Sequence, residues 1–212
     1  MSSNWIFRGV ADATHRLIPC IGRPDVSKDL NTGVNFGYSP DIEKRSIQRF
    51  KREARPQLAI EPRSELDWLS IAQHHGLPTR LLDWSESPLA AAYFALRSGG
   101  FVEKKPRDAA IYGLECPPLL EGDEDLEAAP DVTAYYPKHL TPRITAQRGL
   151  FTYHKVPNTA YEPLSLVQWI LPSELCFTLK VILNKAGFNE ASMFPDLDGI
   201  ASHAAWQLKW SL

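Results

Sequence analysis

QHHGLPTRLLDWSESPLAAAYFA, residues 73–95, connects a predicted strand to a predicted helix and places polar side chains within an apolar frame. The apolar residues of segment 81–84 predict a short buried strand. Ser87 and Pro88 predict the start of a helix, with serine as N-cap and proline at the first helical position. Because backbone N–H groups are unpaired at such a start, anions bind there readily. We therefore expect the functional site at this corner.

The segments on either side predict a mixture of helices and strands. Helices are expected over 41–58, from Ser64 to near Gly76, from Pro88 to Gly99–Gly100, and from Phe194 onward. Strands are expected at 5–7, ending at Arg8-Gly9, and at 81–84, 109–114 and 150–153, with 176–182 read as a strand passing into a short helix. Loops are expected at 10–38, 117–131 and 146–149, the last of them between a strand at 143–144 and the strand at 150–153. This irregular interleaving predicts an α+β fold rather than a doubly wound sheet.

Composition and charge exclude several classes of protein. A chain of 212 residues with 44% hydrophobic and 23% charged residues is typical of one soluble globular domain. The net charge of -2, with both signs interspersed, gives no electrostatic footprint for duplex nucleic acid, although a local basic groove is not excluded. Apolar runs are shorter than the roughly 18 residues of a membrane span, so no membrane partner is expected.

The cysteines, histidines and amino terminus bear on compartment and metal binding. The three cysteines are scattered and form neither a disulfide framework nor a metal pair, and the amino terminus has no signal-peptide hydrophobic region. These features predict a cytoplasmic protein. Adjacent histidines on a helix point about 100° apart, so His74 and His75 are not expected to chelate one ion.

Several blocks of the sequence resemble the FRG domain, a bacterial and phage family named after its Phe-Arg-Gly signature. That signature corresponds here to Phe7-Arg8-Gly9. The longer blocks are residues 73–95, RITAQRGLFT (143–152) and MFPDLDGIA (193–201), in the family's order. The resemblance extends over nearly the whole chain, so we expect a single domain over residues 1–212.

A more distant resemblance is to ADP-ribosyltransferases of the Arg-Ser-Glu type. Phe7-Arg8-Gly9 is similar to the aromatic-Arg-Gly that ends their first core strand, and segment 84–94 looks like their Ser-Thr-Ser strand and the helix after it. This chain departs from the pattern, since Glu86 replaces the middle threonine and Gln147 lies roughly where the catalytic glutamate would be. The resemblance implies a split mixed or antiparallel sheet with helical decorations, and NAD as substrate.

The two arginines near these motifs each have a functional and a structural interpretation. By resemblance, Arg8, beside Gly9, would hold the NAD pyrophosphate through its two-pronged guanidinium. The alternative is an ion pair with Asp12 or Asp83 that fixes the loop. Arg80 is favoured as the partner of Asp83, because a charge in this apolar setting is buried only if it is paired. Its alternative role is a second phosphate or substrate contact.

The remaining candidates would contact the sugar and the rings of the nucleotide. Ser85 could bind a ribose hydroxyl or the nicotinamide amide, whereas Ser87 is explained more simply as an N-cap. His75 could cap a helix end or bind substrate. Aromatic residues at helical spacing often belong to the core, but three of them could stack on nicotinamide or adenine: Trp84, Tyr93 and Phe94.

The residue at position 147 decides the chemistry. Cleavage of the nicotinamide–ribose bond passes through an oxocarbenium-like centre, which a carboxylate stabilises. Gln147 keeps a hydrogen bond but lacks the charge, so either the reaction is slow or different, or another acid serves. Glu86 is the nearest candidate acid by motif, and its alternative is a solvated acid in the first turn of a helix.

Two functions follow from these residues, and a third remains open. The first is an enzyme that cleaves NAD and passes ADP-ribose to an unknown acceptor or to water, with the toxic role in bacterial or phage conflict that the resemblance implies. The second is a non-catalytic module that recognises a nucleotide, nucleic acid or protein through the same pocket. The third is a structural domain in which the polar residues of segment 73–95 only stabilise the connection between the strand and the helix.

Overall fold

The structure, a computed structural model, describes residues 4–24, 26, 37–58, 60–120, 126–138 and 141–210. These residues form an α+β fold, as predicted, and most strands belong to one sheet. The strands are β1 (Trp5–Val10), β2 (Leu81–Ser85), β3 (Phe101–Val102), β4 (Lys105–Pro106), β5 (Ala109–Glu115), β6 (Leu119–Leu120), β7 (Val132–Tyr135), β8 (Gly149–His154) and β9 (Val167–Leu171). Strands β3 and β4 form a separate antiparallel pair.

The main sheet, as far as the structure describes the chain, has seven strands in the order β6-β7-β8-β2-β1-β5-β9. All neighbours are antiparallel except β6 and β7, which are parallel. β1 pairs with β5 along its whole length, so it is longer than predicted, and Arg8 and Gly9 lie within the strand. By contrast, β1 pairs with β2 only where Phe7 lies opposite Ser85. The sheet therefore has two halves that meet at its centre.

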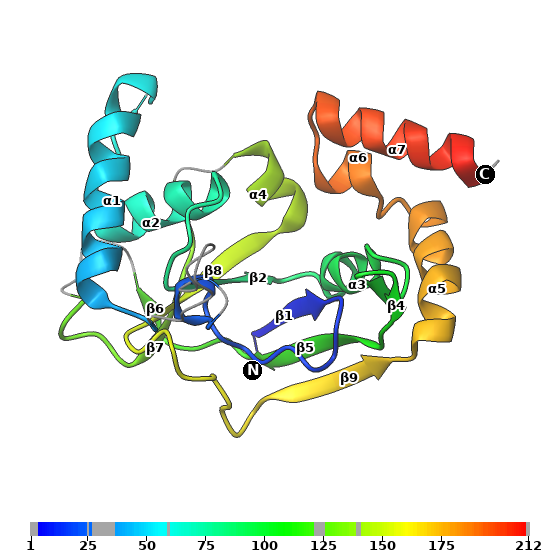
Figure 1. Ribbon diagram of the computed structural model, residues 1–212, viewed down its shortest axis with the longest axis horizontal. Coiled ribbons are helices and arrows are strands. Elements are labelled where there is room, and N and C mark those ends of the chain that lie inside the picture. The colour runs from blue at the N-terminus through cyan, green and yellow to red at the C-terminus, as the bar shows by residue number, and fades with distance from the viewer. Residues whose placement is uncertain are drawn as a thin grey trace.

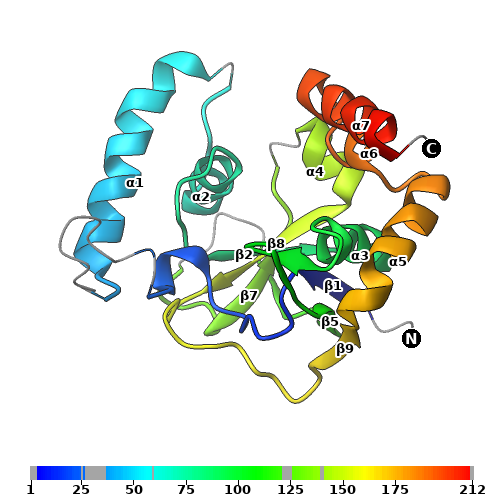
Figure 2. The same ribbon diagram turned by 45° about the vertical axis from the view of Figure 1, so that its right-hand side comes forward.

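The helices stand at the two ends of the sheet and over its middle. They are α1 (Pro40–Ala54), α2 (Glu65–His74), α3 (Pro88–Leu96), α4 (Pro142–Gln147), α5 (Ser173–Lys185), α6 (Glu190–Met193) and α7 (Leu197–Trp210), with short 3-10 helices at Cys20–Gly22 and Arg55–Gln57. In Figure 1 and Figure 2, α1 and α2 stand at one end and α5, α6 and α7 at the other, with α4 between them. None of the helices in the described part of the chain is long and apolar enough to cross a membrane.

Local capping signals placed several helices correctly. The hydroxyl of Ser64 accepts a hydrogen bond from the backbone N–H of Asp67, and that of Ser87 accepts one from Ala90. Both serines are N-caps, as predicted, and each satisfies a backbone donor that the helix leaves free. The expected strand at 81–84 is also confirmed as β2.

The predicted secondary structure is wrong in two segments. Residues 143–144 were expected to form a strand and residues 146–149 a loop, but 142–147 form α4, which begins at Pro142 with Thr141 as its N-cap. Segment 176–182 was expected to begin as a strand because it contains Phe, Val and Ile, yet it lies wholly within α5. Packing of α5 against α3 explains the second error, since tertiary contacts override weak local propensity.

The predicted loops are only partly loops. In segment 117–131, Leu119 and Leu120 form β6 beside β7, and both Leu120 and Ala129 are buried. Residues 121–125 of that segment lie outside the described residues. Segment 10–38 contains one short 3-10 helix, and its residues 25 and 27–36 also lie outside the described residues. Strands β7 and β9 were not predicted.

Close packing of β1 against α3 requires a glycine at position 9. A Cβ atom added to Gly9 would lie 1.8 Å from the carbonyl oxygen of Ala91 and 2.5 Å from the nitrogen of Ala95. Both neighbours are backbone atoms of α3, so they cannot move aside as a flexible side chain would. Gly9 therefore lets the helix lie directly on the strand, and this contact brings Arg8 and Phe94 to the same region.

Candidate functional site

A cleft of about 630 Å³ lies over the centre of the sheet, where β1 and β2 separate. We call it the Arg8 cleft. Its lining comes from β1, α2, β2, α3 and α4 and from residues that follow β1, α3 and α6: Phe7, Arg8, Gly9, Ala11, Gln73, His74, Asp83, Trp84, Ser85, Ala91, Phe94, Arg97, Ser98, Arg143, Gln147 and Phe194. The cleft therefore brings together the amino-terminal signature, the corner in residues 73–95 and the later glutamine.

The Arg8 guanidinium bridges β1 and β2 where their main-chain pairing has ended. Its Nη1 donates to the main-chain carbonyl of Asp83 at 2.7 Å and lies 3.3 Å from the carboxylate Oδ2. The other carboxylate oxygen accepts a hydrogen bond from Nε2 of Gln73 at 2.8 Å. The Arg8 side chain is 17% exposed and that of Asp83 is 63% exposed. The alternative interpretation of Arg8, an ion pair with Asp83, is thus confirmed, and the Asp83 carboxylate still faces the cleft.

The cleft is rich in arginine, but each guanidinium is paired with a carboxylate: Arg8 with Asp83, Arg97 with Glu190 and Arg143 with Asp196. Arg97 and Arg143 also line it, and their guanidinium groups lie 4.9 Å and 5.3 Å from the centre of the Phe194 ring. Among the described residues, Asp83 is the only carboxylate in the lining. Burial, together with the charges of His75 and Arg143, lowers the pKa of His74. An anionic ligand in this cleft would share the arginines with their carboxylate partners.

The amino-terminal end of α3 does not contribute positive charge to the Arg8 cleft. The described lining residues of α3 begin at Ala91, beyond its first turn. We expected the backbone N–H groups of this helix start to bind an anion, but the arginine side chains are the groups that face the cleft.

Ser85 and Gln147 meet in the cleft, but the protein already uses most of their polar atoms. The Ser85 hydroxyl donates to the main-chain carbonyl of Gln147 at 2.6 Å and accepts from the N–H of Ser87 at 2.9 Å. The Gln147 side-chain Nε2 donates to the carbonyl of Met193 at 2.9 Å. Ser85 is only 4% exposed. These contacts join β2, α4 and α6. They leave the side-chain amide oxygen of Gln147, rather than its main-chain carbonyl, as the acceptor for a ligand.

The three predicted aromatic residues have different environments. Trp84 lines the cleft, but its side chain is buried in the core and its Nε1 donates to the Thr152 hydroxyl at 2.9 Å. Phe94 also lines the cleft and packs edge-to-face on Phe194. Tyr93 does not belong to the described lining, since its hydroxyl donates to the Glu190 carboxylate in a second cavity. Of the three predicted rings, Phe94 is therefore the one available to a ligand, and Phe194 lies beside it in the cleft.

The predicted pairing of Arg80 with Asp83 is wrong. Arg80 pairs instead with Glu43 of α1, at 2.8 Å from its Nε and 2.5 Å from its Nη2. The side chains are 19% and 8% exposed, and the guanidinium also lies 5.5 Å from the centre of the Tyr153 ring. Burial opposes the charge of Arg80, but the hydrogen bonds and charge of Glu43 outweigh it and raise the arginine pKa above its usual value. Arg80 therefore has a structural role away from the cleft.

Glu86 and His75 also lie apart from the described lining of the Arg8 cleft. The Glu86 carboxylate is exposed and accepts a hydrogen bond from the Tyr136 hydroxyl at 2.7 Å. His75 is exposed at the end of α2 and borders a separate hollow that includes Ile60. The acid that the motif placed nearest to the reaction is therefore engaged on another part of the surface.

Sequence reasoning missed several cleft residues, among them Gln73, Asp83, Arg97, Arg143 and Phe194. A signal existed for Asp83, because alternate residues of a strand face opposite sides and Asp83 interrupts an otherwise apolar segment. Arg143 and Phe194 lie in the two later blocks that were noted only for their family resemblance. Across the described ranges, no group of three or more His, Cys, Asp or Glu side chains could hold a metal ion.

The fold and cleft define an α+β domain with a cleft lined by arginine and aromatic side chains at the centre of a mostly antiparallel mixed sheet. Residues 3–101, just under half of the chain, match the FRG domain family. The match covers the Phe-Arg-Gly signature and the block at 73–95, whereas the blocks at 143–152 and 193–201 lie beyond it. Comparison with curated proteins and with solved structures gave no match.

Proposed function

We propose that the Arg8 cleft binds NAD and that the protein cleaves the nicotinamide–ribose bond, passing ADP-ribose to water or to an acceptor macromolecule. The observation that carries this proposal is the convergence of Arg8, Ser85 and Gln147 on one cleft from distant parts of the chain. The division of the sheet at Phe7 and Ser85 also supports the resemblance to the split sheet of ADP-ribosyltransferases. Such an activity would deplete NAD and suit a toxic role in conflict between bacteria and phage.

The charges and rings of the cleft suit a dinucleotide. Arg8 is fixed by its contacts to β2, so its remaining N–H groups would meet the pyrophosphate. Arg97 and Arg143 would contribute the N–H donors that their pairs with Glu190 and Asp196 leave unused. Phe94 and Phe194 would contact a base or the nicotinamide ring. The cleft volume of about 630 Å³ lies within the range of roughly 300–1,000 Å³ that is usual for ligand pockets.

In this proposal the carboxylate for bond cleavage is Asp83. The bond between nicotinamide and ribose breaks, its electron pair leaves with nicotinamide, and the ribose becomes oxocarbenium-like. A negative charge beside that centre lowers the barrier. Gln147 is neutral and Glu86 is bound to Tyr136, whereas Asp83 is charged and faces the cleft. Water or an acceptor nucleophile then attacks the ribose carbon and releases its proton to solvent.

Nicotinamide release tests the proposal directly. The wild-type protein should release nicotinamide from NAD, and Arg8→Ala should not. Arg16→Ala is the matched control, because Arg16 is exposed and pairs with Glu162 on the surface. Thermal melting checks that each variant is folded, and Arg143→Gln replaces Arg8→Ala if the latter unfolds. No release with water or any acceptor tried, together with no thermal shift on adding NAD, would contradict the proposal.

One observation favours the second function, a binding module without turnover. The Asp83 carboxylate already accepts hydrogen bonds from Arg8 and Gln73, and the guanidinium offsets part of its negative charge. A partly neutralised carboxylate stabilises a developing cation less well. Binding of NAD that is unchanged by Gln147→Ala, without any nicotinamide release, would support this second function over the first.

A further inference from the structure

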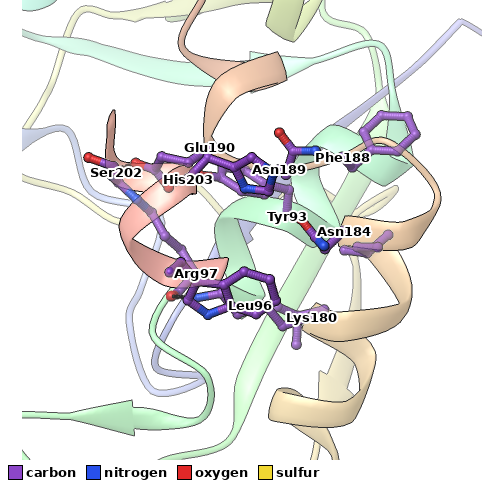
Figure 3. Close-up of a pocket in the computed structure, with 12 residues that line it drawn as sticks. Tyr93, Leu96, Arg97, Lys180, Asn184, Phe188, Asn189, Glu190, Ser202 and His203 are labelled. Carbon is purple, nitrogen blue, oxygen red and sulfur yellow. Dashed lines mark hydrogen bonds and ion pairs between the residues drawn. The ribbon is translucent and has the colours of Figure 1, made fainter. Parts of the chain in front are cut away.

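A second cavity, of about 260 Å³, lies between α3, α5, α6 and α7. We call it the Trp206 cavity. Figure 3 shows its side chains converging from these helices, with Tyr93 on α3, Arg97 directly after α3, and Lys180 and Asn184 on α5. No sequence motif pointed to it, and the proposed NAD chemistry does not use it. Its lining holds two polar groups whose bonding capacity is incompletely used.

The first of these groups is the Lys180 ammonium. It donates to the main-chain carbonyl of Arg97 at 2.6 Å, but it forms no ion pair with any described residue. The one carboxylate in the described lining, Glu190, is engaged by the Tyr93 hydroxyl and the Arg97 guanidinium. Burial and the nearby Arg97 charge lower the pKa of Lys180, whereas Glu190 opposes that shift. A partly buried ammonium without a paired carboxylate is suited to a ligand anion.

The second group is the side-chain carbonyl of Asn184. Its Oδ1 is buried and has no hydrogen-bond partner among the described residues. Buried polar atoms in folded proteins nearly always have a partner, so an exception calls for a physical explanation. Asn184 lies one helical turn after Lys180 on α5, and both border the cavity. Because Oδ1 is closed to solvent in this structure, a ligand donor would satisfy it once the Asn184 amide turns toward the cavity.

The wall on α7 is aromatic. The rings of His203 and Trp206 are stacked, with centroids 6.3 Å apart and planes 16° from parallel. The Lys180 ammonium lies 5.8 Å from the centre of the Trp206 ring. The Lys180 ammonium and the flat apolar ring of Trp206 are therefore adjacent, which suits a planar ring with a negatively charged substituent.

We propose that the Trp206 cavity binds a small planar aromatic carboxylate that also carries a hydrogen-bond donor. The carboxylate meets Lys180, the donor reaches Asn184, and the ring packs against Trp206. At about 260 Å³ the cavity lies just below the range of roughly 300–1,000 Å³ for larger ligands, so it fits one or two fused rings.

Matched probes separate the three contacts. Indole-3-carboxylate has a planar ring, an anion and a ring N–H, whereas indole lacks the anion and 1-methylindole-3-carboxylate lacks the donor. Calorimetry or ligand-observed NMR with the full chain should detect binding of indole-3-carboxylate. Loss of a charged contact or of the partner of a buried polar atom weakens binding markedly, so each of the other two probes should bind about tenfold or more weakly.

Variants on α5 and α7 complete the test. Lys180→Gln should weaken binding of indole-3-carboxylate at least about tenfold, whereas Lys185→Gln, an exposed lysine on the same helix, should not. Trp206→Leu should also weaken it, and circular dichroism verifies folding. Absence of binding at millimolar probe, equal binding of neutral indole, or equal binding by Lys180→Gln would overturn the proposal. If Lys180→Gln unfolds, the relative affinities of indole-3-carboxylate, indole and 1-methylindole-3-carboxylate for the wild-type chain test the proposal instead.

Discussion

Arg8 on β1 is bound to both the main-chain carbonyl and the carboxylate of Asp83 on β2, at 2.7 Å and 3.3 Å. One side chain therefore connects the two halves of the sheet and holds the acid that faces the cleft. This relationship couples the architecture to the proposed chemistry, because the group that would bind phosphate also orients the group that would stabilise the ribose cation.

Replacing Asp83 by asparagine should separate binding from cleavage. Asp83→Asn keeps the main-chain carbonyl that holds Arg8, so NAD should still bind with a Kd within about threefold of wild type. It removes the negative charge beside the ribose, so nicotinamide release should fall about 100-fold or more, as it does when a transition-state contact is lost. Glu86→Gln should leave both quantities unchanged. Equal release by wild type and Asp83→Asn would exclude Asp83 as the acid.

Replacing Gly9 by alanine should destabilise the fold. The added Cβ would meet the Ala91 carbonyl oxygen at 1.8 Å, so α3 must move away from β1. Overpacking of this kind costs about 1–3 kcal/mol and occasionally more. Gly149→Ala is a suitable control, since its Cβ would make only ordinary contacts at 3.5 Å or more. Urea unfolding of both variants measures the difference, and equal stability of the two would contradict the close packing of α3 on β1.

Removing one partner of the Arg80–Glu43 pair should cost more than removing an exposed partner. Arg80→Met leaves the Glu43 carboxylate, which is 8% exposed, without its cation. Breaking a buried pair in this way costs about 3–5 kcal/mol of unfolding free energy. Arg49→Met breaks an exposed pair with Glu53 and should cost under about 1 kcal/mol. The two variants would unfold at similar denaturant concentrations if Arg80 had no structural role.

Stability should fall in mild acid partly because of His154. This side chain is 2% exposed, and burial, with a smaller contribution from the Arg8 charge, lowers its pKa to about 4. An unfolded histidine has a pKa of about 6.5, so the two states bind protons equally above that pH. Between pH 6.5 and about 4 the unfolded chain binds a proton that the folded chain does not, which removes up to about 3 kcal/mol of stability.

The variant His154→Gln isolates this effect. Between pH 6.5 and 5, where most carboxylates stay ionised, its unfolding free energy should change less with pH than that of wild type. The variant His15→Gln, which removes an exposed histidine, gives the curve with which this change is compared. Parallel curves for wild type and His154→Gln would show that His154 is protonated equally in the folded and unfolded states.

Capping residues in the sequence correctly predicted the starts of helices α2 and α3, because those starts depend on residues close by in the chain. Ser64 and Ser87 were identified as N-caps because a hydroxyl satisfies a backbone donor three residues away, and that geometry needs no distant partner. The opposite holds for β9 and α5, whose positions depend on pairing with β5 and packing on α3. A sequence window contains neither partner, so those elements were missed or misassigned.

The same distinction applies to the site. The convergence of Arg8, Ser85 and Gln147 was expected from resemblance, and the structure places all three in one cleft. Partners were harder to predict, because Arg80 and Glu43 are distant in sequence and meet only when α1 packs beside β2 and β8. The direction of the Tyr93 side chain likewise depends on α6, which supplies its partner Glu190.

Calorimetric titration with NAD and its fragments tests most directly whether the Arg8 cleft is a dinucleotide site. NAD and ADP-ribose, which both contain the pyrophosphate, should bind the wild-type protein, and Arg8→Ala should lose at least about 1.5–3 kcal/mol of affinity for both, the value of a charged hydrogen bond. Arg16→Ala should bind both as wild type does. Failure of NAD and ADP-ribose to bind the wild-type protein, or equal binding by folded Arg8→Ala, would contradict the assignment.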